Sequence, residues 1–327
     1  MTAQKTIPAL LFGLFCCLLT SCASPPTSRL PQAILFQAHQ SASASTPGPP
    51  AFLIKDPGQP YNAIGMPDVR EGADQKTEVY VDPDKPALFF ETQEFTTPKG
   101  TYKNQIYRIH FEQVPFALDK LHLTAGKNTG LLIIYTVDNK GQLLLVTTAH
   151  TCGCFLAFFP TRALPAASFP ADWPAKSQWV YGYSLPSLLP SPLANNSDTI
   201  VFTLESETHR ISDVAIRDLA VLQKNYSATE MAIFSMHSLY QLPFKGRTES
   251  FFEMEGARQG YVRDNTKILE RLFISWWAFD LHVGEDKAYG SADTSQTVLY
   301  TSLKFWDREA SDLKNFPRFL SYWGWKL

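Results

Sequence analysis

One histidine and two cysteines lie at alternate positions in the segment 147–155, and they are His150, Cys152 and Cys154. The segment follows a run that predicts a strand, where alternate side chains point to the same face, so the three side chains should form one row. Imidazole and thiolate are ligands for zinc or copper, and thiolates favour Cu(I). A straight row is too long to meet one ion, and Gly153 is the residue that would allow the chain to bend.

A disulfide is the second interpretation of Cys152 and Cys154. Bridged cysteines need Cα atoms about 4.4–6.8 Å apart, which is possible when Gly153 tightens the chain. We expect such a bridge to be strained and to exchange readily with other thiols, while a charged His150 would lower the pKa of a nearby thiolate. The third interpretation is structural: two buried cysteines, or a quiet local disulfide, beside a histidine whose hydrogen bonds are satisfied.

A metal site would need further ligands, and other histidines are the first candidates. His282 is the weaker metal candidate, because it ends a predicted helix beside Glu285 and Asp286. A histidine at a helix C-terminus also interacts favourably with the helix dipole, without any metal. We expect His110 to be solvated on the polar face of its strand. His209 lies near a predicted turn and is expected at the surface.

The first 22 residues carry Lys5, an apolar run from Ile7 to Leu19, and the sequence Leu19-Thr20-Ser21-Cys22. The run is shorter than the roughly 20 apolar residues that span a bilayer, but it has the length of a signal-peptide core. The pattern resembles the signal peptide and lipobox of bacterial lipoproteins. The resemblance implies cleavage before Cys22 and lipidation of that cysteine, which anchors the mature chain in a membrane. An ordinary cleaved secretory signal is the alternative, and it also implies the cell envelope.

Ala23 follows the cysteine, and a residue other than Asp at this position resembles the pattern of Gram-negative lipoproteins sent to the outer membrane. We therefore expect a lipid-anchored envelope protein on the outer membrane, facing the periplasm. Two further cysteines leave with the signal peptide and Cys22 takes lipid, so Cys152 and Cys154 are the thiols of the mature chain. An oxidising compartment favours pairing them with each other.

Composition indicates an ordinary globular protein, with 45% hydrophobic and 18% charged residues and a formal net charge of -2. Because there is no basic surplus, we expect no nucleic-acid partner. Aromatic residues make up 13% of the chain, including seven tryptophans. The proline-rich segment 160–198 predicts a long, aromatic loop that could bind a partner.

The chain divides into four predicted segments. Residues 1–21 form the signal peptide. Residues 22–60 are rich in Ser, Pro and Ala and predict a flexible tether. Residues 61–100 predict an irregular N-terminal segment, and residues 101–327 predict one α+β globular domain.

Strands are expected mainly in the first half of this domain. Alternating apolar residues predict a half-buried strand over 106–112. Turn residues between β-rich runs predict antiparallel hairpins, one joining 131–137 to 143–148 and the other joining 199–204 to 211–216.

Helices are expected in the C-terminal third. Helical spacing predicts helices over 228–239, 266–282 and 311–323. The middle helix carries an apolar stripe that we expect to pack on the core, made of Leu269, Leu272, Phe273, Trp276 and Phe279.

Two functional hypotheses follow. The first is a lipid-anchored envelope protein that binds a transition metal or exchanges disulfides through His150, Cys152 and Cys154. The second is a noncatalytic envelope lipoprotein that binds a protein or glycan partner through its aromatic loop, with structural cysteines. The sequence contains no nucleophile elbow, phosphate-binding loop or H-E-x-x-H zinc motif.

Overall fold

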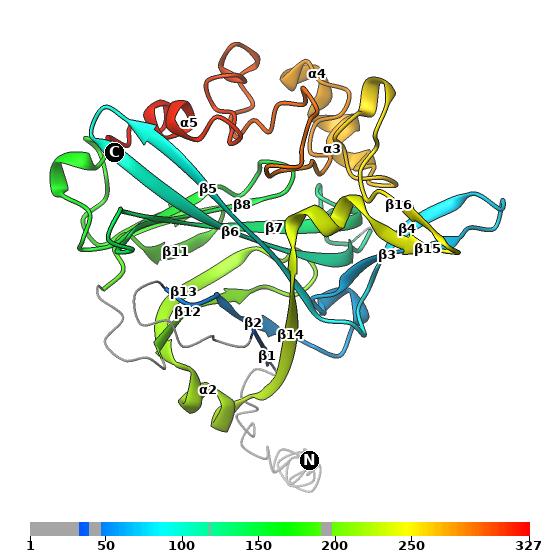
Figure 1. The fold of residues 1–327 in the computed structure, drawn as a ribbon, viewed down its shortest axis with the longest axis horizontal. Helices are drawn as coiled ribbons and strands as arrows, with labels where there is room; N and C mark the ends of the chain where they lie inside the picture. Colours follow the sequence, from blue (N-terminus) through cyan, green and yellow to red (C-terminus); the bar gives the residue numbers. More distant parts are fainter. Residues whose placement is uncertain (1–32, 39–46, 118, 191–197) are drawn as a thin grey trace, which may run out of the picture. The chain divides into compact units, whose positions relative to one another are not determined.

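The computed structural model describes residues 33–38, 47–117, 119–190 and 198–327. The predicted signal peptide and Cys22 lie outside these residues. The chain divides into residues 1–32 and a unit from Ala33 to Leu327. The main element of the second unit is a ten-stranded mixed sheet with the order β13-β12-β2-β1-β14-β5-β6-β7-β8-β9 (Figure 1).

The strands of the large sheet are β1 (Ala33–Ala38), β2 (Ala51–Lys55), β5 (Ala87–Thr97), β6 (Gly100–Val114), β7 (Gly126–Val137), β8 (Leu143–His150), β9 (Ala157–Pro160), β12 (Asp198–Leu204), β13 (Ile211–Asp218) and β14 (Ser227–Ser235). Three two-stranded ribbons accompany it: β3 (Met66–Glu71) with β4 (Thr77–Asp82), β10 (Ser177–Val180) with β11 (Tyr183–Pro186), and β15 (Leu242–Phe244) with β16 (Arg247–Glu249). The α-helices are α2 (Leu219–Asn225), α3 (Ile268–Phe273), α4 (Ser275–Ala278) and α5 (Phe316–Tyr322). Short 3-10 turns include η1 (Pro60–Asn62), η3 (Met236–Tyr240) and η5 (Phe305–Asp307).

The two predicted hairpins are confirmed as β7–β8 and β12–β13. The turn between β7 and β8 is closed by the Gly141 amide, which donates to the Asp138 carbonyl at 3.0 Å. The Asp138 carboxylate also accepts from the backbone amides of Lys140 and Gln142. Local turn chemistry of this kind fixes the register of a hairpin.

The strand expected over 106–112 is confirmed as part of β6, but it is buried on both faces and not half-buried as expected. Tyr107 and Ile109 pack with β1, β2 and β12 on one face. Arg108 and His110, on the other face, are fully buried, because the C-terminal third of the chain covers that side. The His110 ring contacts Phe251 edge-on, so His110 is not solvated as expected.

The structure differs from the expected tether at two places. Residues 33–38 and 51–55 form β1 and β2 inside the large sheet. Strand β1 runs parallel to β14 and antiparallel to β2, and it buries Leu35 and Phe36. These apolar residues pack against residues from distant parts of the chain. The Ser-rich and Pro-rich composition around them gave no indication of such packing. Strands β3, β4 and β5 likewise give regular structure to the segment 61–100.

The expected dominance of strands is confirmed, but the sheet is mixed. The pairs β1–β14, β2–β12 and β5–β14 are parallel, whereas the first half was expected to be antiparallel. The helix expected over 228–239 is wrong, because β14 occupies 227–235 between two parallel neighbours.

The other two expected helices are shortened. The segment 266–282 holds only α3 and α4, which are separated at Ile274. Helix α4 ends at Ala278, and the next residue, Phe279, has a left-handed φ of 51°. Helix α5 begins at Phe316, where Pro317 fits the first turn, and it covers less than the expected 311–323. Helices are therefore few and short in the described C-terminal third.

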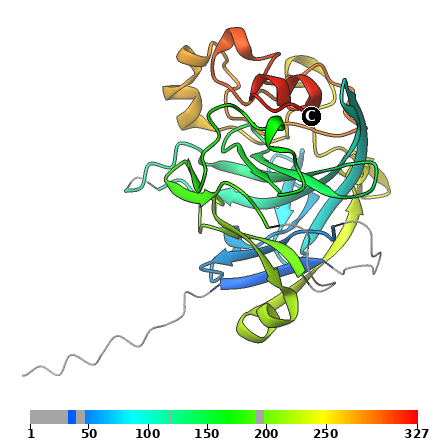
Figure 2. The same ribbon diagram turned by 90° about the vertical axis from the view of Figure 1, so that its left-hand side faces the viewer.

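The elements of the second unit are distributed between two ends. Strand β1 and helix α2 lie at one end, and α3, α4 and α5 lie at the other (Figures 1 and 2). Helix α5 packs its Phe319 and Leu320 on the same core as Phe158 of β9. The C-terminal segments are thereby held over the part of the sheet that carries β8.

Candidate functional site

The loop that follows β8 is a tight turn closed by a disulfide between Cys152 and Cys154, whose Cα atoms are 5.6 Å apart. The Gly153 amide donates to the His150 carbonyl at 2.8 Å, and the His150 amide donates to the Cys154 carbonyl at 2.9 Å. Gly153 has a φ of +92°, and a Cβ there would collide with the carbonyl oxygen of Tyr300. Glycine is therefore required at this position for both conformation and space.

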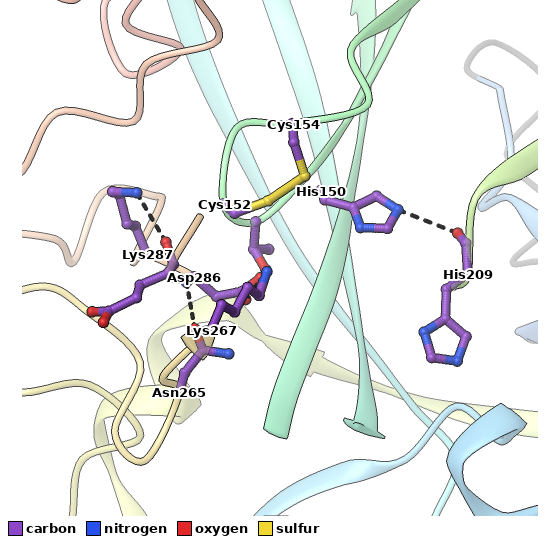
Figure 3. Close-up of a disulfide and its surroundings, with 10 residues drawn as sticks. His150, Cys152, Cys154, His209, Asn265, Lys267, Asp286 and Lys287 are labelled. Atoms are coloured by element: carbon purple, nitrogen blue, oxygen red, sulfur yellow. Dashed lines mark hydrogen bonds and ion pairs between the residues drawn. A yellow bond between two sulfur atoms is a disulfide. The ribbon is translucent and has the colours of Figure 1, made fainter. Parts of the chain in front are cut away.

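The His150 ring points away from the disulfide, toward His209 (Figure 3). Its Nε2 donates to the His209 carbonyl at 3.3 Å. The row expected of His150, Cys152 and Cys154 does not form, because the chain turns directly after His150. Burial, aided by the positive charge of Lys267, lowers the pKa of His150 to about 3. This histidine is neutral at ordinary pH and supplies no positive charge to a thiolate.

His209 is buried, whereas it was expected at the surface. Its ring stacks on Phe111 with the centroids 3.7 Å apart, and its Nε2 donates to the Tyr61 carbonyl at 2.8 Å. Burial, together with repulsion from a charged His150, lowers the pKa of His209 to about 3. The residues around His209 in the sequence do not indicate its burial, because the residues that it contacts come from β6 and η1.

On its other side the loop contacts a buried polar cluster of Thr151, Asn265, Lys267 and Asp286 (Figure 3). The Thr151 hydroxyl donates to Asp286, and Lys267 Nζ lies 2.8 Å from the Asp286 carboxylate. The Asn265 amide oxygen accepts from the Asp286 backbone amide at 2.7 Å. Burial alone would raise the pKa of Asp286, but the Lys267 charge and these hydrogen bonds hold it below its usual range.

Lys287 joins the same loop to the tyrosines beside it. Its amide donates to the Thr151 carbonyl at 2.9 Å. Its ammonium donates to the Glu285 carbonyl at 2.9 Å and lies 5.2 and 5.1 Å from the ring centroids of Tyr261 and Tyr300. Burial lowers the pKa of Lys287 to about 8.

The weaker metal candidate His282 is placed in an ion-pair network instead. Its Nδ1 lies 3.2 Å from Glu285, which also binds Arg258. Asp286 is engaged by Lys267 in the buried cluster. Within residues 33–38, 47–117, 119–190 and 198–327, no three His, Cys, Asp or Glu side chains form a group that could hold a metal ion. The structure therefore does not bring His282 together with His150 and the two cysteines.

The proline-rich segment expected to be a binding loop is packed in part within its described residues, 160–190. Trp173 donates its indole N–H to the Ser187 carbonyl at 2.9 Å and stacks edge-on against Trp325. Trp179 on β10 is exposed, and the neighbouring Tyr181 contacts Phe155 of the disulfide loop. The described part of this segment therefore has packed residues such as Trp173 beside exposed ones such as Trp179.

A larger exposed apolar surface lies on α3, α4 and η5, where the sequence predicted core packing. We call it the aromatic surface, and its ten members are 44–70% exposed: Ile268, Leu272, Phe273, Trp276, Trp277, Phe279, Leu281, Leu303, Phe305 and Trp306. The Phe279 and Phe305 rings are 4.8 Å apart, which joins the two segments into one patch. The spacing of the stripe was visible in the sequence, but the direction in which it faces was not.

The chain matches no protein-family model, no curated protein and no solved structure. None of the helices in the described part of the chain is long and apolar enough to cross a membrane.

Proposed function

We propose that this protein is a lipid-anchored protein of the bacterial cell envelope that binds a partner protein through the aromatic surface, with the Cys152–Cys154 disulfide in a structural role. One observation carries the proposal: ten large apolar side chains are exposed on α3, α4 and η5 and on the residues next to them. Contiguous apolar patches of this kind mark interaction sites, and tryptophans are enriched among the residues that dominate binding energy.

The chemistry of the aromatic surface favours a protein partner over a glycan. Aliphatic side chains such as Leu272 and Leu281 lie among the aromatic rings. The indole N–H of Trp276 is engaged by the Phe273 carbonyl at 2.9 Å, so it is not offered to a sugar hydroxyl. A dry apolar face on the partner would cover such a surface best.

Two basic residues border the aromatic surface and define the rest of the partner's chemistry. Arg271 and Lys304 are exposed, and Glu270 between them and the core is buried. Glu309 is also exposed next to η5, so we expect an apolar partner face that is edged by charges of both signs. Such charges at a rim affect association rate and orientation more than affinity.

The position of β1 supports a partner away from the anchoring membrane. Ten residues, 23–32, separate Cys22 from Ala33, and a segment of that length reaches at most about 35 Å. Strand β1 lies at the opposite end of its unit from α3 and α4, which carry most of the aromatic surface (Figures 1 and 2). With lipid on Cys22, β1 would lie within this reach of the bilayer, which leaves the aromatic surface accessible to a protein in the periplasm.

Site-specific photo-crosslinking in cells that produce the full chain tests this proposal. A photoreactive phenylalanine analogue at Trp276 should give a covalent adduct with one discrete protein, whereas the same analogue at Val221 on α2, which is also exposed, should give none. The captured protein is then identified and purified. Replacing Trp276 and Trp277 by Ser should weaken its binding to the full chain at least tenfold, because buried tryptophans at interfaces contribute about 2 kcal/mol or more each.

Two outcomes would overturn the proposal. An adduct of twice the chain's own mass would identify a second copy as the occupant. Binding of the Cys22→Ser chain to phospholipid vesicles, lost in the Trp276→Ser variant and accompanied by no protein adduct, would identify the membrane as the occupant. The hypothesis that the cysteine pair exchanges disulfides stays a prediction, and it is tested separately below.

A further inference from the structure

A pocket of about 370 Å³ opens next to the aromatic surface. Its walls include Tyr261, Asp280, Tyr300 and Arg308, together with the two glutamines Gln259 and Gln296. Its volume lies near the lower end of the range for small-molecule sites, which is about 300–1,000 Å³. The pocket therefore has room for a small ligand and not for a folded partner.

The charges in the pocket oppose each other. Asp280 accepts from the Tyr300 hydroxyl at 2.8 Å and from the His282 backbone amide at 2.9 Å. Arg308 donates to the Ala278 carbonyl. With one carboxylate and one guanidinium on the same walls, the pocket favours neither a cation nor an anion.

Several polar groups of the pocket have unused hydrogen-bonding capacity. Arg308 Nε is buried and has no partner in the described part of the chain. The side-chain amides of Gln259 and Gln296 make no hydrogen bond to any described residue. Gln259 is half-buried and Gln296 is exposed, so water can reach both amides in the free protein, and a ligand hydroxyl can replace that water.

The walls of the pocket are held in place from behind. The Lys287 ammonium lies between the rings of Tyr261 and Tyr300, at 5.2 and 5.1 Å from their centroids. The Tyr300 backbone rests on Gly153 of the disulfide loop. A site formed before binding loses less entropy when the ligand enters.

We propose that this pocket binds one neutral saccharide unit. Carboxylate, guanidinium and carboxamide groups each present two polar atoms side by side, which matches two neighbouring hydroxyls of a sugar ring. Asp280 accepts from the hydroxyls, Arg308 donates to them, and the glutamine amides do both. The rings of Tyr261 and Tyr300 line the pocket and provide apolar surface for the carbon atoms of the sugar ring. This site is separate from the protein-binding function proposed above.

Calorimetric titration of the detergent-solubilised full chain tests the proposal. The probes are glucose, N-acetylglucosamine, maltotriose and chitotriose, with citrate and spermidine as charged probes. At least one saccharide should saturate a single site with a Kd below about 1 mM, which corresponds to about 4 kcal/mol. Arg308→Lys should weaken that binding at least tenfold. Gln296→Ala removes an exposed side chain that makes no contact needed for folding, and it should weaken binding about fivefold.

The control is Gln223→Ala on α2, at the opposite end of the unit, which should leave saccharide affinity unchanged. Trp276→Ser should weaken partner binding and leave saccharide affinity within twofold, so failure of one proposal is distinguishable from failure of the other. The proposal is wrong if no saccharide saturates a site below about 10 mM, if Gln296→Ala and Arg308→Lys bind as tightly as the original chain, or if only citrate or spermidine binds.

Discussion

Three histidines, His110, His150 and His209, are buried in this protein without charge. Burial is the main cause that lowers the pKa of each one. Their types and positions were readable from the sequence, but their protonation was not. It depends on neighbours such as the Tyr61 carbonyl, which lies 148 positions from His209.

These histidines predict a loss of stability on mild acidification. In the unfolded chain a histidine titrates near pH 6.5. Below that pH the unfolded state therefore binds protons that the folded state does not bind. The contribution of these histidines to the free energy of unfolding is thus fully present above pH 6.5 and is lost as the pH falls toward 3. Each histidine contributes up to about 1.4 kcal/mol per pH unit in this window. Glu91 and Glu270 act in the opposite direction, because burial raises their pKa.

Urea unfolding followed by circular dichroism at pH 7.5, 6.5, 5.5 and 5.0 measures the net effect of these histidines and carboxylates on the free energy of unfolding. We expect the free energy of unfolding to fall by about 2 to 6 kcal/mol between pH 7.5 and 5.0. A constant free energy of unfolding over this range would contradict the expectation that the three histidines outweigh Glu91 and Glu270.

Elements that depend on local signals were predicted better than those that depend on distant partners. The β7–β8 hairpin follows from turn residues such as Asp138 and Gly141. Strand β14 was mistaken for a helix because its parallel neighbours β1 and β5 lie far away in the sequence. The segment 266–282 has helical spacing throughout, yet the break at Ile274 and the left-handed Phe279 leave its apolar stripe exposed.

The disulfide loop predicts a modest effect of its cysteines on stability. A bridge that closes a loop of three residues restricts the unfolded chain only a little, which corresponds to about 1–2 kcal/mol. The double variant Cys152→Ala, Cys154→Ala should therefore unfold with a free energy lower by that amount, measured in urea at pH 7.5. It should keep its partner affinity, because neither cysteine belongs to the aromatic surface.

The disulfide-exchange hypothesis predicts a different result for the same pair. In that case the original chain should accelerate the reduction of insulin by dithiothreitol, and the double variant should not. Equal rates with and without the protein would leave the structural role as the remaining interpretation of the pair.

At the scale of the whole molecule, the proposed anchor attaches the chain to the membrane and the aromatic surface is proposed to bind the partner protein. A lipid chain contributes about 0.8 kcal/mol for each buried CH₂, so acylated Cys22 would dominate membrane attachment. The lipobox was visible in the sequence. The separation of β1 from α3 and α4 could not be predicted from the sequence, because it arises from the order of strands in the sheet.

Cell fractionation tests the anchor. The original chain should sediment with membranes and incorporate labelled palmitate, whereas Cys22→Ser should abolish the label and move most of the protein to the soluble fraction. Cys152→Ser is the matched control and should remain with the membranes. If Cys22→Ser stays in the membrane fraction, another part of the chain holds the protein there.

The central position of β1 has a consequence for how the chain is made and exported. In the register of the sheet Ile34 pairs with Ser227, so the second strand neighbouring β1 emerges almost two hundred residues after β1 itself. Contacts with such long sequence separation form slowly. Strand β1 can pair early with β2, where Leu35 faces Leu53, but its other edge has no neighbour until β14 has been made. If the chain crosses a membrane with its N-terminus first, as the proposed anchor requires, the sheet would be completed only near the end of export, when β14 enters between β1 and β5.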